Sequence, residues 1–251
     1  MRDVKSIEGS STAGGWPVSA RRVGRLVAVT VAAAAGLLGT PMGVPAASAA
    51  PCPDVEVVFA RGTDEAPGVG GVGQAFVDAL RSQVGGRSVE VYAVDYPASS
   101  DFASGVAFAN TVVDGIRDAG SHVQDRAANC PDTRMVLGGF SQGAVVSGFV
   151  TADAVPPGVP VLSVPPPMPP EVANHVAAVA LFGKPSAPFL QSYGAPAIVI
   201  GPLYQSKTIE LCAQGDTICD GAPNGGPTIA HALYPVNGMV AEAASFAAGR
   251  L

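Results

Sequence analysis

Two short stretches of the chain carry hydroxyl side chains in settings that favour nucleophilic chemistry. Gly-Phe-Ser-Gln-Gly at 139–143 contains Ser141 in the Gly-x-Ser-x-Gly pattern. Phe-Ala-Arg-Gly-Thr at 59–63 ends on Thr63, a candidate hydrogen-bond donor. A serine hydroxyl is a weak nucleophile at neutral pH, so Ser141 needs a base to accept its proton and donors to receive the negative charge that its attack creates.

A base and a carboxylate follow the serine along the chain. Cys-Ala-Gln-Gly-Asp-Thr-Ile-Cys at 212–219 places Asp216 between two cysteines, and His231 follows it. A histidine oriented by a carboxylate is the general base that activates serine in ester and amide hydrolysis. The order serine, aspartate, histidine is that of α/β-hydrolases and differs from the orders of chymotrypsin and subtilisin. Together, these residues predict a serine esterase.

The residues around Ser141 match the strand, turn and helix that a nucleophile elbow requires. Arg134–Gly138 is a short apolar run of strand length, and Gln142–Val150 resumes with helical apolar spacing. Gly139 and Gly143 would leave room for neighbouring backbone beside the strained turn. The alternative is a glycine-rich connection between a strand and a helix in which the serine is incidental.

The first 49 residues have the composition of an export signal. Three arginines within residues 21–25 precede an uncharged run at 26–38, and Ala47–Ala49 supplies small residues for cleavage. The run is too short to span a bilayer, so we expect a removed signal peptide and no membrane anchor. The paired arginines indicate twin-arginine export only weakly. Residues 50–251 then form a single domain that is long enough to bury a core.

The charge balance excludes one class of partner. The chain has 14 basic and 20 acidic residues; residues 1–49 hold 5 and 2 of them, which leaves a net charge of −9 in the rest. Binding to nucleic acid depends on a basic surface, which this composition does not supply. The expected partner is therefore an ester or lipid substrate, with no nucleic acid involved.

All four cysteines fall in the predicted domain. An even number in an exported chain indicates two disulfides, for which Cys52, Cys130, Cys212 and Cys219 allow three pairings. The cysteines and histidines do not have the spacing of a zinc site, so no metal is expected.

Strand-like and helix-like segments alternate through residues 50–251. This alternation predicts an α/β fold with a parallel sheet and right-handed crossovers. The expected strands are 55–60, 89–94, 134–138, 176–181 and 208–212. The expected helices include a stripe at Val72, Phe76, Leu80 and Val84, a long helix at about 103–128, one after Ser141, and a last one at about 237–249.

The four stretches, together with the later Ala-His-x-x-Tyr, resemble cutinases, particularly the cutinase-like esterases of actinobacteria. The similarity covers about residues 52–250, and the cysteine-bracketed Gly-Asp is its most specific part. It implies a compact α/β-hydrolase with a five-stranded parallel sheet flanked by helices and no large lid. It also implies a catalytic triad of Ser141, Asp216 and His231, an oxyanion hole formed by Thr63 and Gln142, and no cofactor. Many members of the family have serine at the position of Thr63, and the hydroxyl is retained here.

The expected topology separates the three histidines. In doubly wound sheets the chemistry lies beyond the carboxyl ends of the strands. His122 lies late in a predicted helix and His175 just before the fourth strand, so both should lie at the opposite edge. His231 follows the fifth strand and is the expected base.

The choice of carboxylate is less restricted. Asp216 and Asp220 both follow the last strand, and Asp95 ends the second strand, which should lie far from the fifth. A Cys212–Cys219 bridge would close a small ring around Asp216 and leave Asp220 outside it. We therefore expect Asp216 to orient the base.

The other two cysteines fit a structural bridge. Cys52 and Cys130 each precede a strand, the first and the third, which are neighbours in the order 2-1-3-4-5. Neighbouring strands lie about 4.8 Å apart, within reach of a disulfide. Such a bridge would join the amino-terminal edge of the sheet.

Three loops bear on the substrate. The proline-rich segment Val155–Pro170 could be a lid, but it joins a helix to a strand, so we expect a structural connection at the opposite edge. Loop 184–206 should offer apolar surface to an acyl chain, although part of it could be core. Loop 220–230 is rich in glycine and proline and less apolar than in typical cutinases, which weakens the case for polyester cleavage.

We expect a secreted esterase that acts on short to medium acyl esters, with cutin-like polyesters as a further candidate. It should be extracellular or associated with the cell wall, and monomeric. One alternative is a lipase or phospholipase that acts on long-chain lipids. Another is a non-catalytic surface protein on a hydrolase scaffold, which the intact set of candidate residues argues against.

Overall fold

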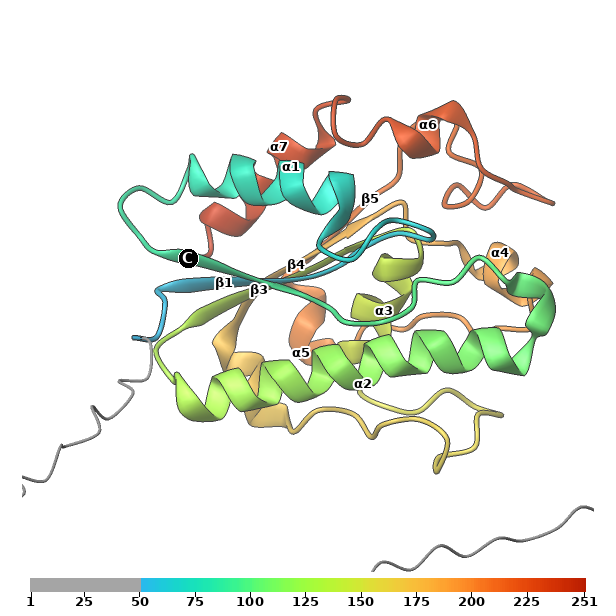
Figure 1. The fold of residues 1–251 in the computed structure, drawn as a ribbon, viewed down its shortest axis with the longest axis horizontal. Helices are drawn as coiled ribbons and strands as arrows, with labels where there is room; N and C mark the ends of the chain where they lie inside the picture. The colour runs from blue at the N-terminus through green and yellow to red at the C-terminus, as the bar shows by residue number, and fades with distance from the viewer. Residues whose placement is uncertain (1–50) are drawn as a thin grey trace, which may run out of the picture. The chain divides into compact units, whose positions relative to one another are not determined.

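A single sheet of five parallel strands forms the centre of the computed structural model, which describes residues 51–251. The predicted signal at 1–49 lies outside the described residues. The strand order is β2-β1-β3-β4-β5, as the sequence predicted (Figure 1). The strands are β1 (Val55–Ala60), β2 (Val89–Ala93), β3 (Arg134–Phe140), β4 (Val176–Phe182) and β5 (Thr208–Leu211).

The central strands are apolar along almost their whole length. All seven residues of β4 are buried, as are all six residues of β1. Continuous apolar runs of this kind are typical of parallel strands that helices cover on both faces. The edge strand β2 is short and only partly buried, and it carries the exposed, charged Glu90. Both features protect the open edge from pairing with another chain.

Helices cover both faces of the sheet, with α1 and α7 on one face and α2 and α3 on the other (Figure 1). Each layer has its own apolar core: Phe59, Phe76 and Phe182 pack together under α1 and α7, whereas Val123 and Val146 belong to the core under α2 and α3. The longer helices are α1 (Gly70–Arg81), α2 (Val106–Asn129), α3 (Gln142–Val150) and α7 (Met239–Ala248), and the shorter ones are η1 (Phe102–Ser104), η2 (Pro170–His175), α4 (Ala187–Ser192), α5 (Pro202–Gln205) and α6 (Ile229–Ala232).

Two of the observed helices, α2 and α7, begin later than predicted, and each begins directly after a glycine. The helix expected from about residue 103 begins at Val106, because Gly105 adopts a φ of +57° and separates it from a short 3-10 turn. The last helix begins at Met239 after Gly238, whose φ is +92°. Glycine adopts positive φ values easily, and a helix cannot continue through a residue with such a φ.

The proline-rich segment departs from its predicted position. Residues 151–169 leave α3 and return to η2 at the amino-terminal edge, but the middle of the segment runs alongside α2 (Figure 1). There Val155, Val159 and Val164 line the same cavity as Ser141. The prediction was wrong because the two ends of a connection fix only where it starts and stops. The course between them depends on contacts such as those of Val155, Val159 and Val164, whose side chains are stabilised by covering an apolar surface.

Two disulfides join the cysteines as expected. Cys52 is bonded to Cys130 at the amino-terminal edge of the sheet, and Cys212 is bonded to Cys219 after β5. Among residues 51–251, no helix is long and apolar enough to cross a membrane.

The Cys52–Cys130 bridge closes a loop of 78 residues, so its main effect should be on stability. Replacing both cysteines with serine should lower the free energy of unfolding by roughly 4–5 kcal/mol, because the unfolded chain regains the entropy of a long loop. The urea midpoint measures this change. A loss below about 1 kcal/mol would contradict the chain-entropy account.

Candidate active site

Ser141 lies on a strained turn between β3 and α3. Its φ of +53° and ψ of −116° are unusual for a residue with a side chain. The turn needs glycine on both sides: a Cβ on Gly139 would overlap the Gly143 carbonyl, and a Cβ on Gly143 would overlap the Ala60 carbonyl. The close approach of α3 to β1 therefore projects the Ser141 hydroxyl beyond the sheet, as a nucleophile elbow does.

His231 lies on the short helix α6, which Thr228 caps by accepting a hydrogen bond from the His231 N–H. Its Nε2 lies 2.9 Å from Ser141 Oγ, and its Nδ1 lies 2.8 Å from Asp216 Oδ2. The ring is mostly buried. Gly183, which follows β4 with a φ of +55°, passes beneath it so closely that a Cβ there would lie 3.0 Å from His231 Cε1.

Asp216 is fully buried in the loop that the Cys212–Cys219 bridge closes. Besides His231, its carboxylate accepts hydrogen bonds from the Ile218 N–H at 3.1 Å and from the Tyr234 hydroxyl at 2.7 Å. A buried carboxylate is costly unless donors surround it. These contacts hold one of its oxygens on the imidazole nitrogen that faces away from the serine.

Tyr234 is the main functional contact that sequence reasoning did not assign. Its hydroxyl accepts a hydrogen bond from the Ala213 N–H at 2.9 Å while it donates to Asp216, and the ring is completely buried. Burial raises the pKa of the Tyr234 hydroxyl well above its usual value, and the adjacent Asp216 carboxylate raises it further. Tyr234 therefore stays a proton donor toward Asp216. The only signal was its place three residues after His231 in Ala-His-x-x-Tyr.

The expected oxyanion groups lie beside the nucleophile. Gln142 is the first residue of α3, where backbone N–H groups lack partners within the helix and the helix dipole is positive. Thr63 lines the same cavity as Ser141. The loop that carries Thr63 is fixed by Glu65, whose carboxylate accepts hydrogen bonds from the Gly62 N–H at 2.6 Å and the Gly71 N–H at 2.7 Å.

The other two histidines lie elsewhere in the fold. His122 stacks on Tyr92 with ring centroids 3.5 Å apart and contacts the buried Glu56. His175 bonds the Pro131 carbonyl at the amino-terminal edge of the sheet. Neither ring contacts Ser141, in agreement with their predicted places.

The contacts that the structure gives the competing carboxylates do not include the imidazole of His231. Asp220 accepts a hydrogen bond from the Ala222 N–H outside the bridged loop. Asp95 is exposed after β2, and its own N–H donates to Asp118. Asp216 is the carboxylate that the structure brings to His231.

The Cys212 and Cys219 sulfurs and an oxygen of Asp216 lie within 4.8 Å of one another. Metal-binding cysteines act as thiolates. Because these two sulfurs are joined in a disulfide, the cluster does not fit a metal ion.

The loops that were expected to frame the site divide between cavity and core. Leu190 and Tyr193 line the cavity that contains Ser141 and His231. Ile200 packs against the core under α2 and α3, and Ile198 lies against α3 where Gly148 leaves room for it. From loop 220–230, Pro227 reaches the cavity.

Comparison with known proteins shows which family the chain resembles. The family model described as Cutinase matches residues 51–251. Probable carboxylesterase Culp7 of Mycobacterium tuberculosis is 65% identical over 170 residues, which cover 68% of this chain and 89% of that protein. Carboxylesterase Culp1 of the same organism is 50% identical over 92% of this chain and 97% of its own length.

The fold is also similar to a solved cutinase. The structure of Trichoderma reesei cutinase in complex with a C11Y4 phosphonate inhibitor matches with a TM-score of 0.56 and 30% identity, over 79% of this chain and 77% of that one. The match to the family model extends over the whole described part of the chain. The chain therefore belongs to the cutinase family of α/β-hydrolases, and its reaction is the hydrolysis of carboxylic esters.

Proposed function

We propose that the protein is an exported serine esterase that uses Ser141, His231 and Asp216 as its catalytic triad. The observation that supports this most directly is the position of His231, whose two ring nitrogens contact Ser141 Oγ and Asp216 Oδ2 at 2.9 and 2.8 Å. This geometry is what general-base activation of a serine requires. Short to medium acyl esters are the simplest substrates, with cutin-like polyesters as a further candidate.

The proposed reaction has two halves. His231 Nε2 accepts the Ser141 proton as Oγ bonds to the ester carbonyl carbon, and the carbonyl oxygen gains the negative charge. The Gln142 N–H and the Thr63 hydroxyl stabilise that charge, a contribution of about 3–4 kcal/mol per donor in related sites. His231 then gives its proton to the leaving alcohol, which leaves an acyl-enzyme. Water, deprotonated by His231, then attacks the acyl carbon. The bond to Ser141 Oγ breaks, His231 returns the proton to that oxygen, and the acid is released.

Asp216 and its neighbours act by positioning the imidazole. The carboxylate fixes the tautomer in which Nδ1 carries the proton, and it stabilises the imidazolium that forms during each half-reaction. Tyr234, the Ile218 N–H and the bridged loop fix the carboxylate in turn. No step of this reaction requires a cofactor.

The predicted export agrees with the two disulfides, because disulfides persist mainly in oxidising compartments. We propose that residues 1–49 direct this export and that the remaining domain acts as a monomer outside the cytoplasm. A lipase acting on long-chain lipids is the second candidate, and the extent of the cavity around Ser141 favours it.

The nucleophile and base can be tested together. Ser141→Ala should abolish hydrolysis of p-nitrophenyl butyrate and labelling by an organophosphonate, because the attacking hydroxyl is gone. His231→Ala should lower kcat by several orders of magnitude. His122→Ala and His175→Ala are the matched controls and should retain kcat; a comparable loss in either control, or turnover without Ser141, would contradict the assignment.

Tyr234→Phe tests the contact that orients Asp216. Removing the hydroxyl should lower kcat about tenfold, since a hydrogen bond to a charged group contributes about 1.5–3 kcal/mol. KM should remain within about twofold, because Tyr234 is not itself among the residues that line the cavity. Steady-state kinetics with one soluble ester separate the two constants. An unchanged kcat would show that the Ile218 N–H and the loop hold Asp216 without Tyr234.

The Cys212–Cys219 bridge should affect rate more than stability. Replacing both cysteines with serine should lower kcat about 100-fold, since a small misplacement of Asp216 misdirects the imidazole. The free energy of unfolding should fall by only roughly 2–3 kcal/mol, because the ring is short. The Cys52–Cys130 double variant is the control and should keep its kcat. Equal effects of the two double variants on kcat would remove the catalytic role of the short bridge.

A further inference from the structure

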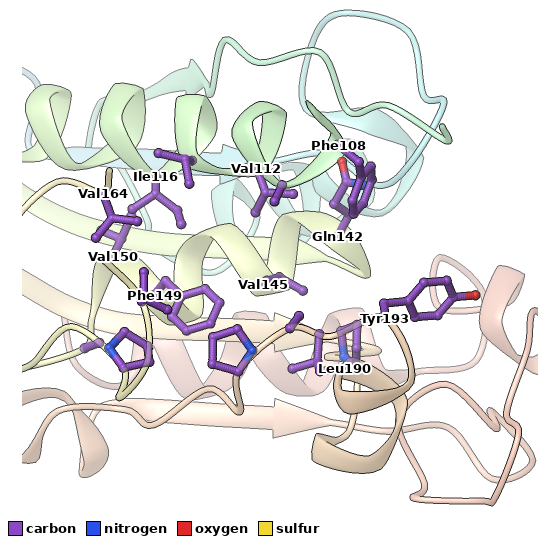
Figure 2. A pocket seen from close by; sticks show the side chains of 18 of the residues that line it. Phe108, Val112, Ile116, Gln142, Val145, Phe149, Val150, Val164, Leu190 and Tyr193 are labelled. Atoms are coloured by element: carbon purple, nitrogen blue, oxygen red, sulfur yellow. The ribbon is translucent and has the colours of Figure 1, made fainter. Parts of the chain in front are cut away.

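The cavity that contains Ser141 and His231 extends far beyond the groups that react. Its volume is about 960 Å³, at the upper end of the range for small-molecule sites. Figure 2 shows that it runs between two helices, with Phe108, Val112 and Ile116 on the α2 side. Its lining continues along α2 from Phe108 to Gln124, which corresponds to about 24 Å at the helical rise per residue.

The walls of this cavity are mostly apolar. The α3 side is formed by Val145, Phe149 and Val150, and Val164 of the proline-rich segment lies at the end away from Tyr193 (Figure 2). Met168 of the same segment also lines the cavity. Polar side chains along α2, such as Ser121 and Gln124, are few among the lining residues, so the channel is poorly suited to a sugar or a peptide. It fits a flexible hydrocarbon chain, whose burial is favourable along its whole length.

A glycine marks unfilled space in the deep part of the cavity. Gly120 is buried within α2 and lines the cavity, yet a Cβ built on it would meet no heavy atom within 4 Å. Gly115, five residues earlier on the same helix, differs: a Cβ there would lie 3.0 Å from Tyr96 and Val146. The packing of α2 on the core is therefore tight at Gly115 and open at Gly120.

Aromatic side chains cover the channel near its mouth. Phe102 contacts Phe108 of α2 with ring centroids 4.7 Å apart and Tyr193 with centroids 5.3 Å apart, and Tyr193 contacts Phe189 of α4. This cluster joins the beginning of α2 to α4. A chain in the channel would pass beneath it and be shielded from water.

The positions of the base and the channel determine which part of an ester enters. His231 must reach the leaving oxygen to protonate it, so the alcohol lies on the His231 side of the carbonyl carbon. The helix α6, which carries His231, lies over the face of the sheet opposite to α2 and α3 (Figure 1). The acyl group therefore points away from α6, into the channel between α2 and α3.

We propose that this channel binds a single long acyl chain of the substrate, with its carbonyl at Ser141 and its distal end near Gly120 and Met168. This inference rests on the proposed catalytic triad and, in place of the short to medium acyl esters expected from the sequence, names a different substrate class: esters of long, unbranched fatty acids. The proline-rich segment then serves as a wall of the acyl site. Its backbone is held by local turns, in which Val159 donates to Pro156 and Ser163 donates to Pro160.

Filling the deep end tests the proposal. Gly120→Leu places a side chain in the open space without disturbing the helix, in which leucine is favoured over glycine. The value of kcat/KM for p-nitrophenyl palmitate should fall at least tenfold, while that for the butyrate ester stays within twofold. Ala128→Leu, on an exposed position of α2, is the matched control and should change neither value.

A second variant, with a larger side chain nearer to Ser141, tests which length of acyl chain reaches each depth of the channel. Val112 lines the cavity two helical turns closer to the mouth than Gly120. Val112→Phe should reduce activity on the octanoate ester as well as the palmitate ester, whereas Gly120→Leu should spare octanoate. Because the two variants block different depths, the proposal remains testable if one of them fails to fold.

A binding measurement avoids any dependence on turnover. Covalent labelling of Ser141 by a hexadecyl phosphonate should raise Tm more than labelling by an ethyl phosphonate, because only the long chain fills the channel. Gly120→Leu should lose that difference. Equal Tm values for both labels on the wild-type protein, or an unchanged palmitate activity in Gly120→Leu, would overturn the acyl channel.

Different results would contradict the proposed esterase function and the proposed acyl channel. Hydrolysis of butyrate that requires Ser141, without any effect of the channel variants, would leave the esterase standing and remove the long-chain site. Failure of the wild-type protein to hydrolyse butyrate or to take up either phosphonate would instead remove the proposed catalytic function.

Discussion

The close contact between the start of α3 and the end of β1 is the constraint on which the rest of the site depends. Gly143 lies against the Ala60 carbonyl, and no side chain would fit between them. This contact forces the left-handed backbone at Ser141 and projects its hydroxyl beyond the sheet. It also places the first N–H groups of α3 directly after Ser141, where we propose that they receive the carbonyl oxygen. The strain is tolerated because β3 and α3 are both buried and well packed.

The same helix connects the reacting groups to the cavity. Its amino-terminal end carries Gln142, and its side facing α2 carries Val145 and Phe149 along the channel. The orientation of α3 therefore sets both the position of the proposed oxyanion donors and the direction of the proposed acyl channel. The base approaches from the other face of the sheet, on a loop that a disulfide and Tyr234 hold in place. Ser141 and His231, which separate parts of the fold hold in place, meet at the carboxyl edge, where loops from several strands converge.

Burying the Asp216 carboxylate is energetically unfavourable, and the loop after β5 offsets this cost with hydrogen bonds. A carboxylate without solvent would ordinarily be protonated or unstable. Here the Ile218 N–H, the Tyr234 hydroxyl and the His231 ring each donate to it or face it within 3.1 Å. The Tyr234 hydroxyl donates to Asp216 and accepts from the Ala213 N–H, while its ring is buried in the core. One aromatic residue therefore both packs the core and orients the carboxylate.

The sequence by itself determined the strands, their order, both disulfides and the residues that meet at Ser141. These features are local or follow from topology: apolar runs of strand length, glycines that a tight turn requires, and the rule that parallel strands end at one edge. The role of Tyr234 and the course of residues 151–169 were decided only by the tertiary structure. No local pattern shows which hydroxyl a buried carboxylate will find, and a connection rich in proline has no periodicity to show the surface it will cover. The channel arises for the same reason, because empty space such as that beside Gly120 exists only once helices from distant parts of the chain have packed.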